Sequence, residues 1–126
     1  MIVGTGIDLV DVDRFRRLLQ RRGEAALRRL FTEAERRAAG GAHAAERLAG
    51  TFAAKEAALK SLGTGLRRMA WREVEVVRDA LGKPELRLFG RAAARARAVG
   101  AARFHVSISH LGSYAVAQVI AEGEAP

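Results

Sequence analysis

Hydrophobic and polar positions change their spacing several times along the chain, and each spacing predicts a different kind of element. Residues 2–10 carry β-branched side chains in loose alternation, which predicts a strand. The period then becomes helical, and Asp11 or Asp13 can cap a helix that ends near Gly23. The chain is therefore expected to open with a strand followed directly by a helix.

Two further helices are predicted in the middle of the chain. Thr32 followed by Glu35 is a capping-box pattern that opens a short helix. The longest helical pattern runs from about residue 42 to residue 62, and Gly63 is placed to end it. One stripe of this long helix faces the core and contains Lys55, which is unusual for a lysine unless its ammonium reaches solvent or pairs. The large apolar members of the stripe are Leu48, Phe52, Leu59 and Leu62.

The second half of the chain alternates mainly with a period of two. It predicts four strands, with an Ala- and Arg-rich helix between the second and the third that ends near Gly100. Together these elements predict an α+β fold over residues 1–126, one domain in which an antiparallel sheet packs with one long helix and shorter helices. Residues 122–126 are expected to be a frayed tail. The four predicted strands cover residues 73–78, 85–89, 104–110 and 114–121.

Composition agrees with one domain and limits the compartments in which we expect the protein. A chain of 126 residues with 49% hydrophobic content can form one core and is too short for two ordinary ones. It has no cysteine, so it has neither disulfides nor a thiolate metal site. The first charged residue is Asp8 and no basic stretch precedes it, so we expect no signal peptide, no membrane span and a cytoplasmic location.

The formal net charge of +8 favours an anionic partner, although Arg and Ala are frequent throughout the chain. The densest basic stretch lies in the first helix, where Arg14, Arg17 and Arg21 fall at helical spacing on one face. Two interpretations remain open. The face is either simply solvated, or it is a docking strip for a polyanion or an acidic protein.

Asp8 is the first candidate for chemistry. In a strand it shares one face with Gly4 and Gly6, because successive side chains point to opposite faces. It is either a polar strand end or a metal ligand beside space left open for a bulky substrate.

Glu56 and Lys60 are the second candidates, at i and i+4 on the edge of the long helix's apolar stripe. They form either an ordinary helix ion pair, worth about 0.2–0.5 kcal/mol, or part of a ligand site. The neighbouring Ala49 and Ala53 favour the second interpretation, since small side chains leave a groove along the helix.

The turn Gly63-Thr64-Gly65 follows the long helix directly. It is not a P-loop, because its lysine precedes the glycines and the turn does not open a helix. Its backbone amides could bind an anion, against the helix dipole, or it could be only a C-terminal cap. On a later strand, Ser109 and His110 have no acid at triad spacing, which argues against serine nucleophile chemistry.

The order of these segments closely resembles the holo-acyl-carrier-protein synthase family, a family of phosphopantetheinyl transferases. The resemblance covers residues 1 to about 121, and the chain length fits the small homotrimeric members of the family. Thr51 departs from the pattern, because members usually have a larger or basic residue there. The motifs that carry the resemblance are GID at residues 6–8 with Arg14-Phe15, FAAKEAALKSLGTG at residues 52–65 and VSISH at residues 106–110.

The resemblance implies a reaction: transfer of 4′-phosphopantetheine from coenzyme A to a serine of an acidic apo acyl carrier protein, releasing adenosine 3′,5′-bisphosphate. Asp8 and Glu56 would hold Mg²⁺, for which hard carboxylate oxygens are suitable ligands. Glu56 is also the candidate base, and Lys60 would neutralise the leaving phosphate.

The resemblance also implies how the substrates bind. Gly63, Thr64 and Gly65 would line the coenzyme A site, and the basic helix would receive the carrier protein through Arg14 with Arg17 and Arg21. The active sites would lie between subunits of a homotrimer. The residues expected from a neighbouring subunit are Pro84, Ser109 and His110.

The main alternative is a non-enzymatic module that binds nucleic acid through the Arg-rich helix. One Trp, one Tyr and five Phe provide few aromatic side chains for base stacking. No groove-reading or single-strand motif is present, and the alternative leaves Asp8 and Glu56 unexplained. We therefore expect no nucleic-acid partner.

Overall fold

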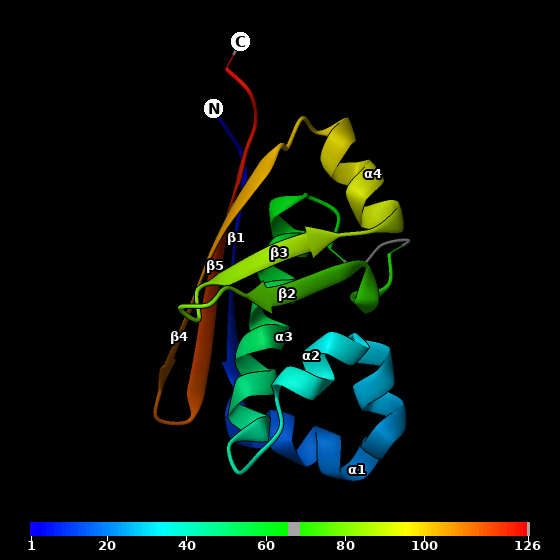
Figure 1. The fold of residues 1–126 in the computed structure, drawn as a ribbon, viewed down its shortest axis with the longest axis vertical. Coiled ribbons are helices and arrows are strands. Elements are labelled where there is room, and N and C mark those ends of the chain that lie inside the picture. Colours follow the sequence, from blue (N-terminus) through cyan, green and yellow to red (C-terminus); the bar gives the residue numbers. More distant parts are fainter. Residues whose placement is uncertain (66–68, 126) are drawn as a thin grey trace.

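The computed structural model describes residues 1–65 and 69–125, and its elements follow the predicted order (Figure 1). Helices and antiparallel strands combine in one α+β domain, which confirms the predicted fold class. The strands are β1 (Ile2–Asp11), β2 (Val74–Arg78), β3 (Pro84–Leu88), β4 (Arg103–Leu111) and β5 (Tyr114–Glu122). The helices are α1 (Val12–Leu30), α2 (Glu33–Ala38), α3 (Ala44–Ser61) and α4 (Gly90–Ala98), with a short 3₁₀ helix η1 (Trp71–Glu73).

The strands form two antiparallel sheets, where the sequence had suggested one. β1, β5 and β4 make a three-stranded sheet in that order, and β2 pairs with β3 as a separate hairpin. In the larger sheet Asp8 of β1 lies opposite Ala117 of β5, and Ile108 of β4 lies opposite the same alanine. Alternation predicts strands but not their partners, because pairing depends on distant segments.

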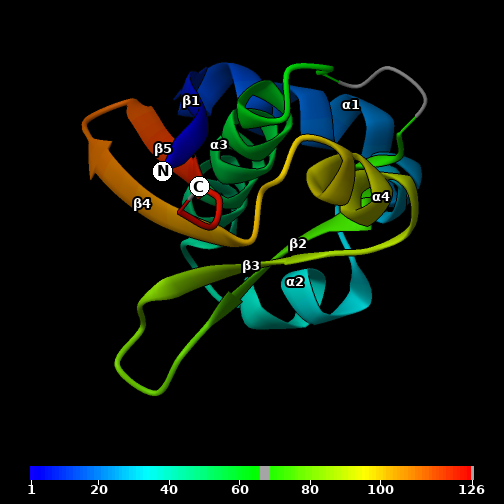
Figure 2. The ribbon, with the colours of Figure 1, turned by 90° about the horizontal axis from the view of Figure 1, so that it is seen from above.

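Helix α3 lies between the two sheets, with α1 and α2 near its first turns and α4 near its last (Figures 1 and 2). Ten of its 18 residues are buried, which is the expected pattern for a helix covered on most sides. Many of these residues are alanines, so neighbouring elements can approach the helix axis closely. The central position of α3 means that its few polar side chains are either paired inside the core or directed at the surface.

Two glycines of β1 allow α3 to contact the strand through backbone atoms. A Cβ on Gly4 would lie 1.9 Å from the Ser61 carbonyl oxygen, and one on Gly6 would lie 1.9 Å from the Ala57 carbonyl oxygen. The expectation that these glycines leave space for a substrate is therefore wrong, because α3 fills that space.

The alanines of α3 beside Glu56 have the same explanation. Ala49 and Ala53 have no exposed surface, so the groove expected along them is also absent. Small residues on the helix and glycines on the strand together set a short distance between α3 and β1. What the sequence suggested as room for a ligand is close packing between two elements.

Helix α1 begins where the sequence predicts, since the Asp11 side chain accepts a hydrogen bond from the Arg14 amide at 3.1 Å. The backbone leaves helical geometry at Gly23, with φ 63° and ψ −147°. A second helical segment then continues to Leu30, so the prediction that the helix ends near Gly23 missed this segment. A glycine is favoured here because positive φ strains other residues.

The C-terminal segment is ordered two residues further than predicted. Glu122 pairs with Ile2 and with Arg103 in the sheet. The Gly123 amide donates to the Met1 carbonyl oxygen at 2.7 Å, and the Met1 amino group donates to the Gly123 carbonyl oxygen at 3.0 Å. The expected frayed tail is therefore wrong for residues 122 and 123, and Pro126 lies outside the described residues.

An aromatic cluster joins α1, α3 and η1. Phe15 and Phe52 have ring centroids 5.3 Å apart, and Phe52 and Trp71 have centroids 4.9 Å apart. Phe31 meets the edge of Phe15 at 6.2 Å. These rings contribute to the core rather than to a stacking surface. Among the helices described here, none combines the length and apolarity that crossing a bilayer requires.

Candidate active site

The fold brings Asp8, Glu56 and Lys60 together where the second half of β1 meets α3. The Lys60 ammonium lies 3.2 Å from the Asp8 carboxylate and donates to the Ile7 carbonyl oxygen at 3.0 Å. Lys60 thus pairs across to the strand, and within the described residues it forms no ion pair with Glu56, so the interpretation as an ordinary ion pair within the helix is wrong. The Asp8 side chain is only 12% exposed, whereas that of Lys60 is 51% exposed.

Glu56 has unusual electrostatics for a surface helix residue. Partial burial and, after it, the nearby Asp8 carboxylate together raise the pKa of its carboxyl to about 6, whereas Lys60 opposes the shift. Two carboxylates therefore face each other with less water around them than usual. An additional cation between them would relieve their repulsion.

The donor set fits Mg²⁺. This ion prefers hard oxygen ligands and is commonly bound by one or two carboxylates, with water and substrate phosphates completing its shell. Asp8 and Glu56 offer two such carboxylates. Within the described residues, no group of three or more His, Cys, Asp or Glu side chains could hold a metal ion.

An open pocket of about 620 Å³ adjoins these carboxylates. Asp8 and Glu56 lie on its wall, and so do Arg14 and Arg21 of α1 and Tyr114 at the start of β5. The volume is in the range of small-molecule sites. The predicted metal ligands and the predicted docking strip, which are distant in sequence, therefore border the same pocket.

The three predicted docking arginines are all exposed. Arg14, Arg17 and Arg21 line a second depression next to the first. Arg16, in the same basic stretch, has a different role, because its guanidinium binds Asp13 at 2.8 Å and Glu46 of α3 at 2.7 Å. The basic stretch is thus divided into an outward strip and one arginine that joins two helices.

The turn Gly63-Thr64-Gly65 lies at the C-terminal end of α3, one turn beyond Lys60. Gly63 and Gly65 have φ values of 79° and 56°, which explains why glycine occupies both positions. The Gly63 amide donates to the Lys60 carbonyl oxygen at 3.0 Å. Arg95 of α4 donates to the Leu62 carbonyl oxygen next to the turn at 3.0 Å. The sequence had no signal for Arg95, which lies in an Ala- and Arg-rich helix.

Pro84, Ser109 and His110 lie away from the pocket of Asp8 and Glu56. Pro84 begins β3 and lines a separate depression of about 540 Å³ between β3 and β4. Ser109 is exposed on the outer face of the sheet. His110 points to the opposite face, where its ring lies 2.9 Å from the position of a Cβ on Gly50 of α3. A single chain therefore does not bring these three residues to the carboxylates.

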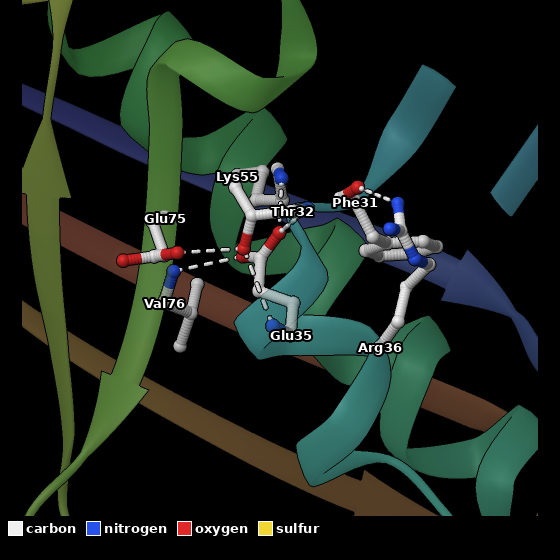
Figure 3. Close-up of polar contacts among 7 residues, drawn as sticks. All are labelled: Phe31, Thr32, Glu35, Arg36, Lys55, Glu75 and Val76. Carbon is white, nitrogen blue, oxygen red and sulfur yellow. Dashed lines mark hydrogen bonds and ion pairs between the residues drawn. The ribbon is translucent and has the colours of Figure 1, made fainter. Parts of the chain in front are cut away.

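Lys55, the residue before Glu56, is fully buried and paired (Figure 3). Its ammonium lies 2.5 Å from the Glu35 carboxylate, whose other oxygen accepts the Val76 amide of β2 at 2.8 Å. Burial lowers the pKa of Lys55, and the Glu35 carboxylate opposes that shift. The expectation that a lysine in the core-facing stripe must reach solvent or pair is met by pairing.

The same network includes the predicted capping box of α2. Thr32 accepts the Glu35 amide at 3.2 Å, and Glu35 accepts the Thr32 amide at 2.8 Å. The Thr32 hydroxyl also donates to Glu75 of β2 at 2.6 Å (Figure 3). The capping box was predicted from sequence, whereas its link to Lys55 and β2 was not. The network joins α2, α3 and β2 through Lys55, which directly precedes Glu56 in α3.

Comparisons with known proteins agree on one family. The profile of a family described as the 4′-phosphopantetheinyl transferase superfamily matches residues 4–119. The holo-[acyl-carrier-protein] synthase of Geobacter metallireducens is 50% identical over 124 residues, which are 97% of this chain and 98% of that protein.

Solved structures match as well. The holo-[acyl-carrier-protein] synthase of Neisseria meningitidis superposes with a TM-score of 0.89 at 35% identity, covering 97% of this chain and 99% of that one. The synthase of Bacillus anthracis, solved in complex with CoA (3′,5′-ADP), superposes with a TM-score of 0.80 at 37% identity. That match covers 98% of this chain and 99% of the other.

Proposed function

The chain belongs to the 4′-phosphopantetheinyl transferase superfamily, and we propose how its own residues perform the reaction of the holo-acyl-carrier-protein synthases within it. The enzyme transfers 4′-phosphopantetheine from coenzyme A to a serine of an apo acyl carrier protein. The products are the holo carrier protein and adenosine 3′,5′-bisphosphate. The comparisons give no support to the nucleic-acid alternative. The observation that supports the assignment of residues is the pairing of Asp8 with Lys60 beside Glu56, at a pocket that Arg14 also borders.

Asp8 and Glu56 are the proposed Mg²⁺ ligands. When bound, the ion would screen the negative charge that develops as the P–O bond inside the coenzyme A diphosphate breaks, on the side of the phosphorus that carries pantetheine. Asp8 is held in place by the close packing of β1 against α3, so its carboxylate is oriented before any ligand arrives. Glu56 projects from the same helix that carries Lys60, and β1 with Asp8 packs closely on that helix, so the backbone positions of the three residues are fixed relative to one another.

Lys60 and Glu56 are the proposed catalytic groups. The half-exposed Lys60 ammonium can donate to the leaving phosphate while it remains beside Asp8. Glu56, directly or through a water molecule, would accept the proton of the carrier serine as its oxygen attacks phosphorus. A pKa of about 6 suits this role, because a base works best when its pKa is near the operating pH.

The basic strip of α1 is the proposed docking surface for the carrier protein. Arg14, Arg17 and Arg21 are exposed and lie next to the pocket of the carboxylates. An acidic carrier bound there would bring its serine toward Glu56. Gly63, Thr64 and Gly65 would line the coenzyme A site at the end of α3.

We propose that the enzyme is a homotrimer with sites between subunits. The outer face of the three-stranded sheet exposes Ile7 by 61%, Leu9 by 64%, Leu111 by 86% and Tyr114 by 51%. An apolar face of this kind is typical of a protein interface. Ser109 lies on the same face, so a neighbour could receive it, and Pro84 and His110 are proposed to reach the neighbouring site too. A cytoplasmic location is proposed as well, which the lack of cysteine fits.

The test is incubation with coenzyme A, Mg²⁺ and an apo carrier protein, followed by intact mass of the carrier. We expect the wild-type chain to add one phosphopantetheine group, and Asp8→Asn and Glu56→Gln to add almost none. Glu33→Gln is the matched control, because Glu33 is an exposed carboxylate on α2 that is not among the residues lining the pocket. Equal transfer by Asp8→Asn and Glu33→Gln would contradict the metal assignment. Sedimentation of the wild-type chain as an active monomer would contradict the trimer.

A further inference from the structure

Arg95 connects α4 to the end of α3 at the turn that is proposed to receive coenzyme A. Its side chain is half-buried, and its Nε donates to the Leu62 carbonyl oxygen at 3.0 Å. One of its terminal nitrogens lies 3.6 Å from the position that a Cβ on Gly63 would take. The guanidinium therefore covers both the last carbonyl of α3 and the first glycine of the turn.

The electrostatics of this position favour a cation. The last carbonyl groups of a helix carry a partial negative charge, which repels an anion at the turn that follows. Arg95 binds one of these carbonyls and places a full positive charge beside it. Lys60 in the last turn of α3 is a second cation near the helix end, partly neutralised by its pair with Asp8. Together they offset the helix dipole that makes a C-terminal turn a poor phosphate site.

Helix α4 is itself held firmly, so Arg95 is directed at the turn before any ligand binds. The Glu73 carboxylate accepts hydrogen bonds from the backbone amides of Arg91 and Ala92 and from the Arg91 guanidinium. These contacts anchor the first turn of α4 to η1. Arg97, on the same helix, is exposed. Of the α4 arginines, only Arg95 has a hydrogen bond to α3 within the described residues.

We propose that Arg95 is a positioning residue for coenzyme A binding: it holds the Gly63-Thr64-Gly65 turn and offsets the dipole of α3 so that the turn accepts the diphosphate. This inference rests on the proposed function, since it assumes that the turn lines the coenzyme A site. It adds a residue from α4 to the part of the site that one chain forms from β1, α3 and the turn after α3. Loss of Arg95 should weaken coenzyme A binding without changing the carrier's contacts on α1.

The experiment compares Arg95→Ala, Arg95→Lys and the matched control Arg97→Ala. Calorimetry measures coenzyme A binding, and steady-state transfer measures KM for coenzyme A and for the carrier separately. We expect Arg95→Ala to weaken coenzyme A binding about tenfold, the usual effect of losing a charge-assisted hydrogen bond. Arg95→Lys should recover part of the affinity, because it keeps the charge but not the planar fork of donors. Arg97→Ala should stay within about twofold of wild type, as expected of an exposed charge screened by solvent.

Three outcomes would overturn the proposal: wild-type coenzyme A affinity in Arg95→Ala, equal weakening in Arg97→Ala, or an equal rise in the carrier's KM. If Arg95→Ala proves too unstable to measure, the pair Arg95→Lys and Arg97→Lys decides, with several-fold weaker binding expected for the first alone. A wild-type chain that neither binds coenzyme A nor transfers its arm would overturn the proposed function as well. A fully active wild type with unaffected Arg95 variants would overturn the role of Arg95 alone.

Discussion

Helix α3 carries two lysines, Lys55 and Lys60, whose surroundings are opposite. Lys55 has no exposed surface and is paired with a carboxylate that is equally buried. Lys60 is 51% exposed and lies beside Asp8, which stays partly open to solvent, with Glu56 near both. The two lysines have the same chemistry and the same helix, so only their position around the helix axis separates them.

This difference shows how burial divides structural from chemical roles. The ion pair of Lys55 and Glu35 is closed to outside ligands, because both side chains are buried and Glu35 also accepts two backbone amides. At the other pair, partial burial and the neighbouring Asp8 carboxylate raise the pKa of Glu56, and Lys60 does not fully offset the rise. An incompletely compensated site at the surface can take up a metal ion, whereas a buried ion pair without access to solvent holds the fold.

The largest expected effect is on stability at the buried pair. Lys55→Met should lower the free energy of unfolding by about 3–5 kcal/mol, because it leaves the Glu35 carboxylate buried without its cation. Urea denaturation measures this loss. Adding Glu35→Gln should restore part of it, since the amide needs no cation, although its single oxygen can accept only one of the two backbone amides that Glu35 accepts. If Lys55→Met left the free energy of unfolding unchanged and greatly reduced turnover per folded molecule, Lys55 would have a chemical rather than a structural role, which would contradict the comparison.

The same substitution at the other lysine should act on the reaction. Lys60→Met should lower kcat about a hundredfold, as loss of a cation that stabilises developing charge typically does. The free energy of unfolding should change by less than about 1 kcal/mol, because pairs open to solvent contribute little. Steady-state transfer and urea denaturation on one preparation test both statements. Normal turnover in Lys60→Met would remove Lys60 from the proposed chemistry.

A smaller effect is expected from pH. Because the pKa of Glu56 is raised to about 6, its carboxyl is mostly protonated at pH 5 and mostly ionised at pH 7. Metal affinity should therefore rise roughly tenfold between these values, following the ionised fraction. Folding has the opposite sign: the folded chain binds the extra proton between the ordinary pKa and about 6, so Glu56 makes the metal-free protein less stable as pH rises through that range.

Titration of Mg²⁺ into wild type and Glu56→Gln at several pH values measures this dependence. The variant should bind weakly and with a much flatter pH profile. A wild-type profile that stays flat between pH 5 and pH 7 would show that the Glu56 carboxyl is not the titrating ligand.

The smallest expected effect concerns the outer strip of α1. Arg14→Glu should raise the carrier's KM severalfold at low salt and leave coenzyme A affinity unchanged, because exposed charges act mainly by steering and complementarity. The difference should shrink as salt increases. Arg28→Glu, at the far end of α1, is the control. Equal effects of the two substitutions would mean that overall charge matters, rather than the strip.

Sequence patterns located the elements of this fold well because those patterns are local. The cap at Asp11, the capping box at Thr32 and the stop at Gly63 each depend on a few neighbouring residues. The division of the strands into two sheets could not be predicted, since it depends on which strand covers which face of α3. The glycines of β1 were misinterpreted for the same reason: a missing side chain does not reveal whether a ligand or a helix occupies the space.

The candidate site was predicted from motif order rather than from geometry. Asp8, Glu56 and Lys60 were proposed from distant segments, and the fold brings them together. Arg95 and the buried partner of Lys55 could not be predicted, because each depends on a contact between elements far apart in the chain. Lys55 itself did show an anomaly, a charge in an apolar stripe, and such an anomaly indicates that a partner must exist without naming it.

The order of strands in the larger sheet also affects how the chain can be made. Strand β1 pairs only with β5 in that sheet, and β5 lies more than a hundred residues later. On the ribosome, β1 therefore has no partner until nearly all of the described chain has been synthesised. Until then, β1 can pack its glycine face on α3 but lacks the strand that pairs with its edge. Contacts this distant in sequence slow folding, so the emerging chain is expected to spend its longest vulnerable period with this sheet unfinished.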